Sequence, residues 1–291
     1  MELLTLWPLS QGEIERRREG FVDALFSPAW NLESITGQPE RDLVGRVLRG
    51  GYPELCTTRA PSRRGAWFDA YTSSIIQRDI RELANIEGLV EIPRLLALLA
   101  TRAAGLANYS EIARDLGIPQ TTLKRYLALL RMTFLVQTIP AWYANLGQRL
   151  VKSPKLYLCD SGLLAHLLKV TPESMQMDRK RFGQVLENFV VLELRKQCAW
   201  SEGRPEIFHL RVHQREEVDI ILEDRAGRLV GIEVKAGATL GPDDFKGLRW
   251  LAGIGKRFMR GVILYLGKRS VTIGPGLHAV PLNALWDVRA D

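Results

Sequence analysis

The sequence predicts an α/β protein with several domains, and three observations support this fold class. Residues 10–101 have mostly helical patterns, residues 107–168 combine two short helices with two strands, and residues 171–291 alternate helices with strands. A chain of 291 residues is long enough for two or three domains with a sizeable core. We therefore expect the domains 1–100, 101–170 and 171–291.

The composition is that of an ordinary globular protein with a positive charge. Hydrophobic residues make up 46% and charged residues 25% of the chain. No run approaches the length of a membrane span, and we expect no signal peptide because a basic region with an apolar core is missing at the start. Three widely spaced cysteines form no metal-ligand pairs, which favours a reducing cytoplasm. The net charge of +7 mildly favours nucleic-acid binding.

Residues 1–100 are expected to be mainly helical after one short strand. The apolar segment at residues 2–7 predicts a strand that has no partner before it. The helical pattern that follows is broken at residues 37–39 and 50–54, where glycine and proline occur together. A helix is expected over residues 67–83, with apolar residues at Trp67, Tyr71, Ile75 and Ile76.

Residues 101–170 have the pattern of a winged helix. Ser110 can cap a helix at residues 111–116, a turn with Gly117 follows, and a second helix covers residues 120–131. Strands are expected at residues 134–140 and 155–160, with a wing between them. Lys124 and Arg125 lie on the exposed side of the second helix, where DNA-binding proteins place their contacts. Alternatively, the winged helix serves only for packing or as a hinge.

Residues 217–235 predict a β-hairpin whose turn centres on Ala226. One face is then apolar and comprises Val218, Ile220 and Leu222 opposite Val234, Ile232 and Val230. The other face places Asp219 opposite Glu233, and Glu217 opposite Lys235. Like charges across a strand pair destabilise it, so a bound divalent cation would explain the two carboxylates. Alternatively, these are solvated edge residues with a weak Glu217–Lys235 surface pair.

The remaining part of residues 171–291 supplies a third carboxylate. A helix is expected over residues 181–198, with Glu187 beside its apolar stripe. A strand at residues 206–211 precedes the hairpin, a helix at 243–252 follows it, and strands are expected at 261–266, 271–273 and 277–282. His209 and His213 are expected to be a solvated pair, since no third metal ligand is near.

This order of helices and strands resembles the PD-(D/E)XK, restriction-endonuclease-like fold. In that family a helix glutamate, a strand aspartate and a Glu-x-Lys surround a divalent ion, and the matching residues are Glu187, Asp219, Glu233 and Lys235. The resemblance implies that Glu187, Asp219 and Glu233 bind Mg²⁺ for hydrolysis of DNA phosphodiesters. Asp219, Glu233 and Lys235 would be catalytic, with Lys235 orienting the attacking water or stabilising the developing charge.

The whole chain resembles the C-terminal part of AAA-type ATP-binding proteins of bacteria and archaea that carry a DUF4143 region. The matching signatures are Leu6-Trp7-Pro8-Leu9-Ser10, Gly50-Gly51-Tyr52-Pro53-Glu54, Arg78-Asp79-Ile80, the winged helix and Leu156-Tyr157-Leu158-Cys159-Asp160-Ser161-Gly162-Leu163. The resemblance implies a helical remnant of an ATPase lid at residues 1–100, then a winged helix, then an endonuclease-like domain.

The nucleotide-binding residues of those ATPases are missing from this sequence. Neither Gly255-Lys256 nor Gly267-Lys268 has the second glycine and the following hydroxyl of a phosphate-binding loop. We therefore expect no ATPase activity from this chain, and ATP would be a cofactor only if the natural protein has an N-terminal core. Expected partners are DNA, a second copy or that core, with no membrane. The chain is then a Mg²⁺-dependent nuclease, a non-catalytic DNA- or protein-binding regulatory module, or an ATPase fragment that is inactive alone.

Overall fold

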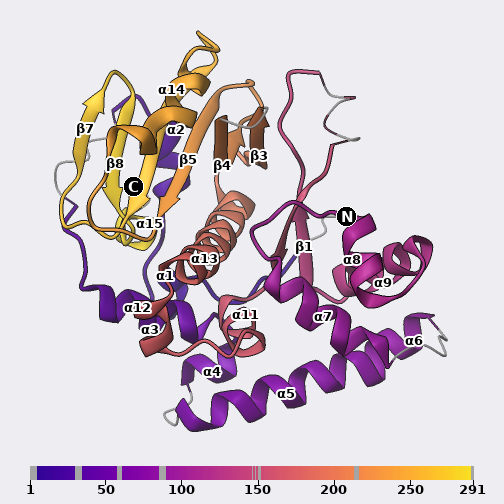
Figure 1. The fold of residues 1–291 in the computed structure, drawn as a ribbon. Helices are drawn as coiled ribbons and strands as arrows, with labels where there is room; N and C mark the ends of the chain where they lie inside the picture. The colour runs from indigo at the N-terminus through magenta and orange to yellow at the C-terminus, as the bar shows by residue number, and fades with distance from the viewer. Residues whose placement is uncertain are drawn as a thin grey trace.

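The computed structural model describes residues 5–29, 35–57, 61–84, 90–145, 147, 149, 152–212 and 216–289. These residues form helices and two β-sheets, which confirms the α/β fold class. Figure 1 shows a large sheet at the upper left, with helices along the lower and right-hand sides. Among the helices in these ranges, none is both long enough and apolar enough to cross a membrane.

The N-terminal region is helical, as expected. Its helices are α1 (Gln11–Ile14), α2 (Phe21–Phe26), α3 (Glu40–Arg49), α4 (Pro53–Thr57), α5 (Arg64–Ser74) and α6 (Arg81–Ala84). A π-helix at Ile75–Ile80 joins α5 to α6, so the predicted helix at 67–83 is one helical segment with a wider turn inside it.

The predicted strand at residues 2–7 is wrong for its described part. Residues 5–7 form no strand, and residues 2–4 lie outside the described ranges. Leu6 is exposed, whereas the ring of Trp7 packs edge-on against Phe134 with 5.6 Å between ring centroids. The Arg195 guanidinium lies 5.8 Å from the centroid of the Trp7 ring, so among the described residues side-chain contacts hold this segment in place of strand pairing.

The helical region packs directly on the C-terminal region. One hydrophobic core runs from Phe21 to Trp286 and includes buried residues from all three predicted domains. The two ends of the described chain also meet. Gly20 N–H donates to the carbonyl of Val288 at 2.9 Å, and Arg17 forms an ion pair with Asp287. The division into domains 1–100, 101–170 and 171–291 stays a prediction.

The helices and strands expected of the winged helix are observed within residues 91–158, and we keep that name for them. The winged helix comprises α7 (Glu91–Thr101), α8 (Tyr109–Leu116), α9 (Gln120–Met132), β1 (Val136–Ile139) and β2 (Lys155–Leu158), with β1 and β2 antiparallel. The cap of α8 is Asn108 rather than Ser110, because the Asn108 side chain accepts the N–H of Glu111. Gly117 has φ +70° and ends α8 in the left-handed region, where glycine has no side-chain penalty.

The large sheet has the strand order β3-β4-β5-β6-β8-β7. Its strands are β3 (Glu206–Val212), β4 (Glu216–Glu223), β5 (Leu229–Lys235), β6 (Phe258–Tyr265), β7 (Val271–Gly274) and β8 (Leu277–Pro281). Glu223 pairs with Leu229, and Ile220 with Ile232, so the predicted hairpin register is confirmed for residues 220–223. Strand β5 is parallel to β6, which is parallel to β8.

Helices cover both faces of this sheet. The long helix α13 (Arg179–Trp200) packs on one face, and α14 (Lys246–Ala252) packs on the other after a 3₁₀ turn at Pro242–Phe245. Two short helices, α11 (Ser161–Leu167) and α12 (Pro172–Met177), precede α13, and α15 (Ala284–Asp287) follows the sheet.

The start of β4 departs from the predicted alternation. Phe208 pairs with Ile221 but Leu210 pairs with Val218, so the register shifts by one residue between them. Ile220 and Leu222 therefore belong to the large core that includes α13, whereas Val218 packs with Leu248 and Leu251 of α14. The predicted apolar face is correct for Ile220 and Leu222 and wrong for Val218.

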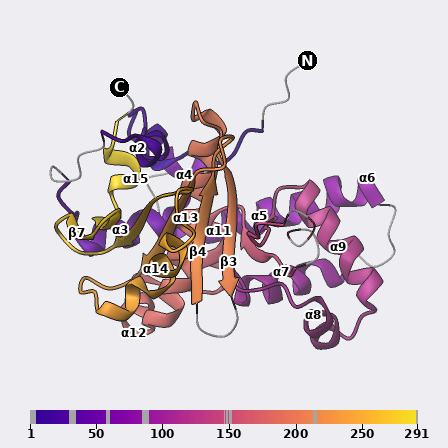
Figure 2. The ribbon, with the colours of Figure 1, turned by 90° about the horizontal axis from the view of Figure 1, so that it is seen from above.

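The winged helix is joined to the edge of the large sheet. Trp142 N–H donates to the carbonyl of His209 at 2.7 Å, and His209 N–H donates to the carbonyl of Pro140 at 3.0 Å. In Figure 2, β3 and β4 stand between the winged helix and the rest of the large sheet. This attachment directs side chains of β2 toward the first residues of β4.

Candidate functional site

A lysine of the winged helix lies among acidic side chains of the C-terminal region. The Nζ atom of Lys155 is 2.9 Å from Glu217 Oε1, 3.0 Å from Glu187 Oε1 and 3.4 Å from Asp219 Oδ1. These carboxylates come from α13 and β4, whereas Lys155 is the first residue of β2. We call the carboxylates of Glu187, Glu217 and Asp219, which surround Lys155, the acidic site.

Tyr157 is a further member of this environment. Alternate residues of a strand point to the same side, so Tyr157 follows Lys155 on one face of β2. Its hydroxyl donates to Glu187 Oε1 at 2.8 Å. Glu187 therefore receives two hydrogen bonds from β2, which hold its carboxylate in one orientation.

The structure also brings the predicted β5 residues to this end of the sheet. Val234 N–H donates to Asp219 Oδ2 at 3.0 Å, so the Asp219 side chain reaches β5. Lys235 Nζ lies 3.3 Å from Glu233 Oε2 and 3.6 Å from Asp244 Oδ1. The expected pairing of Glu217 with Lys235 is wrong, because the register shift in β4 leaves Glu217 in contact with Lys155.

Burial and mutual repulsion alter the charges of this cluster. Burial, followed by the charge of Asp219, raises the pKa of Glu187 to about 8, although Lys155 opposes this shift. Burial and Asp219 likewise raise the pKa of Glu233 well above its ordinary value, against the effect of Lys235. Burial alone would lower the pKa of Lys155, but Asp219, Tyr157, Glu187 and Glu217 outweigh burial and raise this pKa well above its ordinary value. Lys155 therefore stays charged at neutral pH.

The carboxylates do not fit a divalent cation in this arrangement, although their oxygens are the ligands that Mg²⁺ prefers. The Lys155 ammonium stands among three of them, and a second cation at that position would be repelled. Within the part of the chain that the structure describes, no three acidic, histidine or cysteine side chains are grouped to hold a metal. Mg²⁺ binding by Glu187, Asp219 and Glu233 stays a prediction.

Glu187 also borders a cavity of about 480 Å³. Backbone and side chains of residues 101–105 line one side, and α13 lines the other with Lys180, Arg181 and Gln184. Gln184 Nε2 donates to the carbonyls of Ala103 and Thr101 at 2.9 and 3.0 Å, which fixes the two walls relative to each other. Glu187 is the member of the acidic site that lines this cavity, and the other charged lining residues are Arg102, Asp178, Lys180 and Arg181.

Comparisons with known proteins place this site inside a recognised family region. Residues 182–285 match the family model DUF4143, a domain of unknown function. The chain contains a DUF4143 region. Residues 40–174 match a second domain of unknown function, DUF8612, which covers the winged helix and helices α3 to α6 before it. Glu187, Asp219, Glu233 and Lys235 all lie in the DUF4143 region, whereas Lys155 lies in the DUF8612 region.

Two curated relatives are similar to most of this chain. The uncharacterized protein Rv2008c of Mycobacterium tuberculosis is 30% identical over 259 residues, which cover 87% of this chain and 57% of that protein. The uncharacterized protein Mb2031c of Mycobacterium bovis shows the same identity and coverage. The chain thus spans little more than half the length of these relatives.

One solved structure matches this chain at low similarity. The protein VC1899 of Vibrio cholerae is 14% identical, and the match covers 79% of this chain and 55% of that chain with a TM-score of 0.26. A TM-score of this size carries no argument about the fold.

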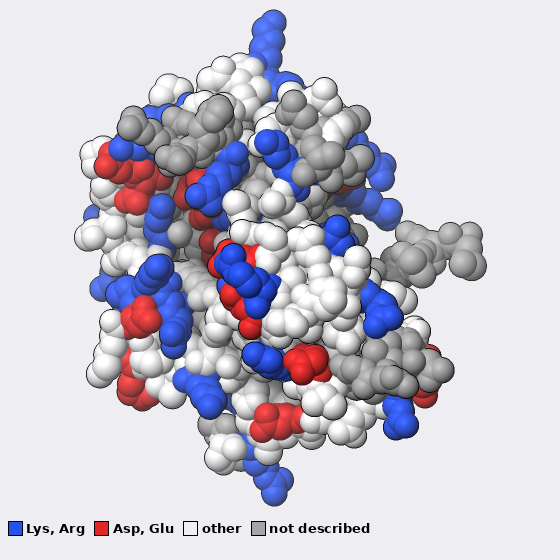
Figure 3. All heavy atoms as spheres, turned by 45° about the vertical axis from the view of Figure 1, so that its right-hand side comes forward, with Lys and Arg blue, Asp and Glu red and all other residues white. Residues whose placement is uncertain are grey.

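The predicted DNA-contacting residues are exposed on the winged helix. Lys124 and Arg125 lie on the solvent side of α9, and Arg114 is exposed on α8. Within the described ranges, none of these three cations forms an ion pair with an acidic residue. Figure 3 shows the basic side chains of the face it presents in separate groups with acidic groups between them, not as one continuous patch.

His209 is buried rather than solvated, so that expectation is wrong for this residue, and His213 lies outside the described ranges. Its Nε2 lies 3.2 Å from the carbonyl oxygen of Ser153. Burial, followed by the charge of Lys155, lowers the pKa of His209 to about 4. His209 is therefore a neutral residue in the joint between the winged helix and the DUF4143 region.

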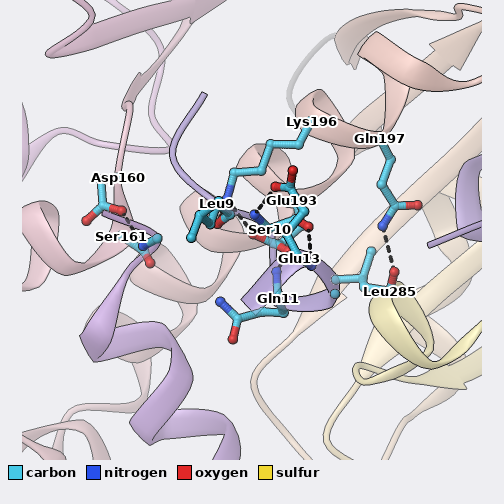
Figure 4. A network of polar contacts seen from close by, with 12 residues as sticks. Leu9, Ser10, Gln11, Glu13, Asp160, Ser161, Glu193, Lys196, Gln197 and Leu285 are labelled. Carbon is cyan, nitrogen blue, oxygen red and sulfur yellow. Dashed lines mark hydrogen bonds and ion pairs between the residues drawn. The ribbon is translucent and has the colours of Figure 1, made fainter. Parts of the chain in front are cut away.

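A second buried polar network ties the N-terminal segment to α13, as Figure 4 shows. Lys196 Nζ donates to the carbonyl of Leu9 at 2.9 Å and to Glu193 Oε1 at 2.6 Å, and Gln11 N–H donates to Glu193 Oε2 at 2.8 Å. Leu9 N–H donates to the carbonyl of Gly51 at 2.7 Å. The separate signatures that include Leu9 and Gly51 thus meet at α13.

Sequence reasoning missed Lys155 and Tyr157. The sequence does contain a signal for Lys155, because this lysine opens the apolar run Leu156-Tyr157-Leu158 of a predicted strand. A lysine that is buried in such a strand needs acidic partners. The identity of those partners could not be inferred, since Glu187 and Asp219 lie 32 and 64 residues away along the chain.

Proposed function

We propose that this chain is a non-catalytic DNA-binding module, in which the winged helix contacts DNA and the acidic site of the DUF4143 region is closed by Lys155. The observation that carries the proposal is the exposed surface of α9. Thr121, Lys124, Arg125 and Ala128 are exposed and follow the spacing of one helical face, while Leu123, Leu127 and Leu130 are buried.

The charge of this face supports contact with a polyanion. Helix α9 contains Lys124, Arg125 and Arg131 and no acidic residue. Arg114 on α8 adds a further exposed cation beside it. A lysine or arginine that neutralises a phosphate releases a condensed counterion, so such contacts supply a salt-dependent part of the affinity. Small exposed residues such as Thr121 and Ala128 would allow this face to approach DNA closely.

The test compares two double variants that remove the same charge. Lys124→Ala with Arg125→Ala removes two cations from α9, whereas Lys256→Ala with Lys268→Ala removes two exposed cations near the ends of α14 and β6. Binding of a labelled DNA duplex is measured by fluorescence anisotropy over a range of salt. We expect the α9 variant to bind DNA at least about tenfold more weakly. We also expect the slope of log K against log salt concentration to become less steep by about 2.

The second double variant is the control, and we expect it to retain nearly the affinity of the wild type. Equal weakening by both double variants would indicate attraction to the overall charge of the protein and not to α9. Absence of DNA binding by the wild type would reject the proposal.

A second candidate function is Mg²⁺-dependent phosphodiester hydrolysis by the residues that the sequence predicts to be a metal and catalytic site. The convergence of Glu187, Asp219, Glu233 and Lys235 at one end of the sheet favours it, and the position of Lys155 opposes it. Cleavage of single- and double-stranded DNA is measured with Mg²⁺ and with Mn²⁺. Cleavage by the wild type that is lost in both Asp219→Ala and Lys235→Ala would favour hydrolysis over the non-catalytic function.

We further propose that the chain corresponds to a module of a longer AAA-type ATP-binding protein. The DUF4143 match and the greater length of the mycobacterial relatives support this affiliation. ATP binding is measured by equilibrium dialysis for this chain and for the full-length Mycobacterium tuberculosis relative. We expect binding only by the longer protein, and a relative that binds no ATP would contradict the affiliation.

A further inference from the structure

We propose that Lys155 is a built-in counterion of the acidic site, whose ammonium takes the position of a divalent cation and whose removal creates a cation site there. The inference rests on the part of the proposed function in which Lys155 closes the acidic site. It does not depend on DNA binding by α9. It assigns a role to a residue of the winged helix rather than of the DUF4143 region.

The number and placement of the contacts support this role. A lysine ammonium has three N–H donors and no acceptor. Lys155 Nζ has one carboxylate oxygen each from Glu187, Glu217 and Asp219 within 3.4 Å. Each donor can therefore be directed at a different carboxylate. A single positive centre surrounded by oxygens from separate chain segments is also the arrangement in which hard cations are bound.

Lys155 is held at this position by its backbone. It pairs with Ile139 of β1 on one side and bridges to Leu106 on the other. Its side chain is only 3% exposed, in contrast to surface lysines, whose long side chains move freely. Tyr157 in the same strand also binds Glu187. The counterion is thus part of a fixed strand and does not depend on an adaptable surface contact.

Among the described residues, the carboxylates around Lys155 are not grouped to hold a metal, so removal of this charge would create a metal site by letting them move together around an ion. Glu187, Glu217 and Asp219 would keep their oxygens but lose the cation that balances them. Glu187 borders the cavity of about 480 Å³, so one of the three carboxylates lies at an existing hollow. Lys155→Met is the most direct variant, because methionine retains an unbranched apolar chain and has no charge.

The experiment measures binding of Mn²⁺ alone and Mg²⁺ alone, without nucleic acid. Mn²⁺ binding is followed by electron paramagnetic resonance, and thermal unfolding is recorded with and without each ion. We expect no saturable site in the wild type or in Lys152→Met, which removes a nearby exposed lysine. We expect one saturable site in Lys155→Met, with a Tm that saturating ion raises by about 5 °C. Lys155→Met with Asp219→Asn should lose this response.

Two results would overturn the inference. The first is a saturable Mn²⁺ site in the wild type that Asp219→Asn abolishes, since the site would then be open with Lys155 in place. The second is a folded Lys155→Met protein whose ion binding and Tm response match those of the wild type. If Lys155→Met does not fold, Lys155→Met with Glu217→Gln, which has one carboxylate fewer to balance, takes its place with the same expected result.

DNA affinity of Lys155→Met is measured in parallel with the anisotropy assay. A gain of ion binding in a protein that binds no DNA would support the counterion role and reject the DNA-binding function. An unchanged DNA affinity without any gain of ion binding would support the DNA-binding function and reject the counterion role. The two proposals therefore fail separately.

Discussion

Asp160 Oδ2 accepts a hydrogen bond from the backbone N–H of Gly51 at 2.7 Å, across 109 residues of sequence. Its second oxygen, Oδ1, accepts the N–H of Leu163 at 2.8 Å and caps α11. Gly50 has φ +73°, and a Cβ there would lie 2.2 Å from Asp160 Oδ1. This buried carboxylate therefore connects the glycine segment of the helical region with the first turn of α11.

Asp160→Ala is expected to lower the free energy of unfolding by about 2–4 kcal/mol, because it removes a helix cap and leaves the buried Gly51 N–H without a partner. Asp178 caps α13 at an exposed position, so Asp178→Ala should cost only about 1 kcal/mol. Urea unfolding followed by circular dichroism measures both. Equal losses would show that the link to Gly51 adds no stability.

Glu19→Gln is expected to change how stability depends on pH. Burial, followed by the charge of Glu193, raises the pKa of Glu19 to about 7. Between the ordinary carboxyl pKa of 4.5 and this value, the folded protein holds a proton that the unfolded chain has released. The free energy of unfolding therefore falls as pH rises through this interval, by up to about 3 kcal/mol at this site.

Glutamine mimics the protonated side chain, so Glu19→Gln should gain stability relative to the wild type between pH 5 and pH 8. Its amide can still accept the N–H of Gly12 and donate to the hydroxyl of Ser10, the two groups that bind Glu19. Thermal unfolding of both proteins across this range provides the measurement. A difference in Tm that is constant with pH would show that Glu19 has an ordinary pKa.

Two glycine substitutions are expected to have opposite effects. A Cβ on Gly247 of α14 would lie 2.0 Å from the carbonyl oxygen of Glu217, so Gly247→Ala must displace α14 from β4. We expect Gly247→Ala to lower the free energy of unfolding by at least about 2 kcal/mol. Gly45 of α3 has open space around its Cβ position, so Gly45→Ala should add about 0.5–1 kcal/mol. Denaturant unfolding checks the two signs, and a tolerated Gly247→Ala would contradict the close approach.

Lys155→Met in metal-free buffer is expected to destabilise the protein by about 3–5 kcal/mol, because it leaves buried carboxylates without their cation. Lys246 pairs with Asp243 on the surface at 2.9 Å, so Lys246→Ala should change stability by less than about 1 kcal/mol. Chelator-treated protein is unfolded in urea for this comparison. Similar losses for both variants would place Lys155 among ordinary surface lysines.

The sequence contains enough local information for most elements and for the hairpin register. The turn at Ala226 fixes the pairing of Ile220 with Ile232, because both strands alternate regularly near the turn. The opposite orientation of Val218 depends on how β4 pairs with β3, and the register shift between those strands has no local pattern. Local alternation therefore predicts the hairpin near its turn and fails where a third strand determines the geometry.

The acidic site was predictable in part for a related reason. Glu187, Asp219, Glu233 and Lys235 follow a pattern within consecutive elements, so their convergence could be expected. Lys155 enters from a different region, through the attachment of residues 140–142 to His209 at the sheet edge. Such a contact depends on how the winged helix packs against the large sheet. The spacing of apolar residues within either region does not specify this packing.

The contact of Arg17 with Asp287 joins residues 270 positions apart, and Gly20 hydrogen-bonds to Val288 beside it. A ribosome makes the chain from its amino end, so this early segment waits for its partners until almost the whole described chain has been synthesised. Contacts of such large sequence separation slow folding and leave apolar surface exposed meanwhile. Phe21 and Leu25, which follow Gly20 and end up fully buried, would be natural targets for chaperones during translation.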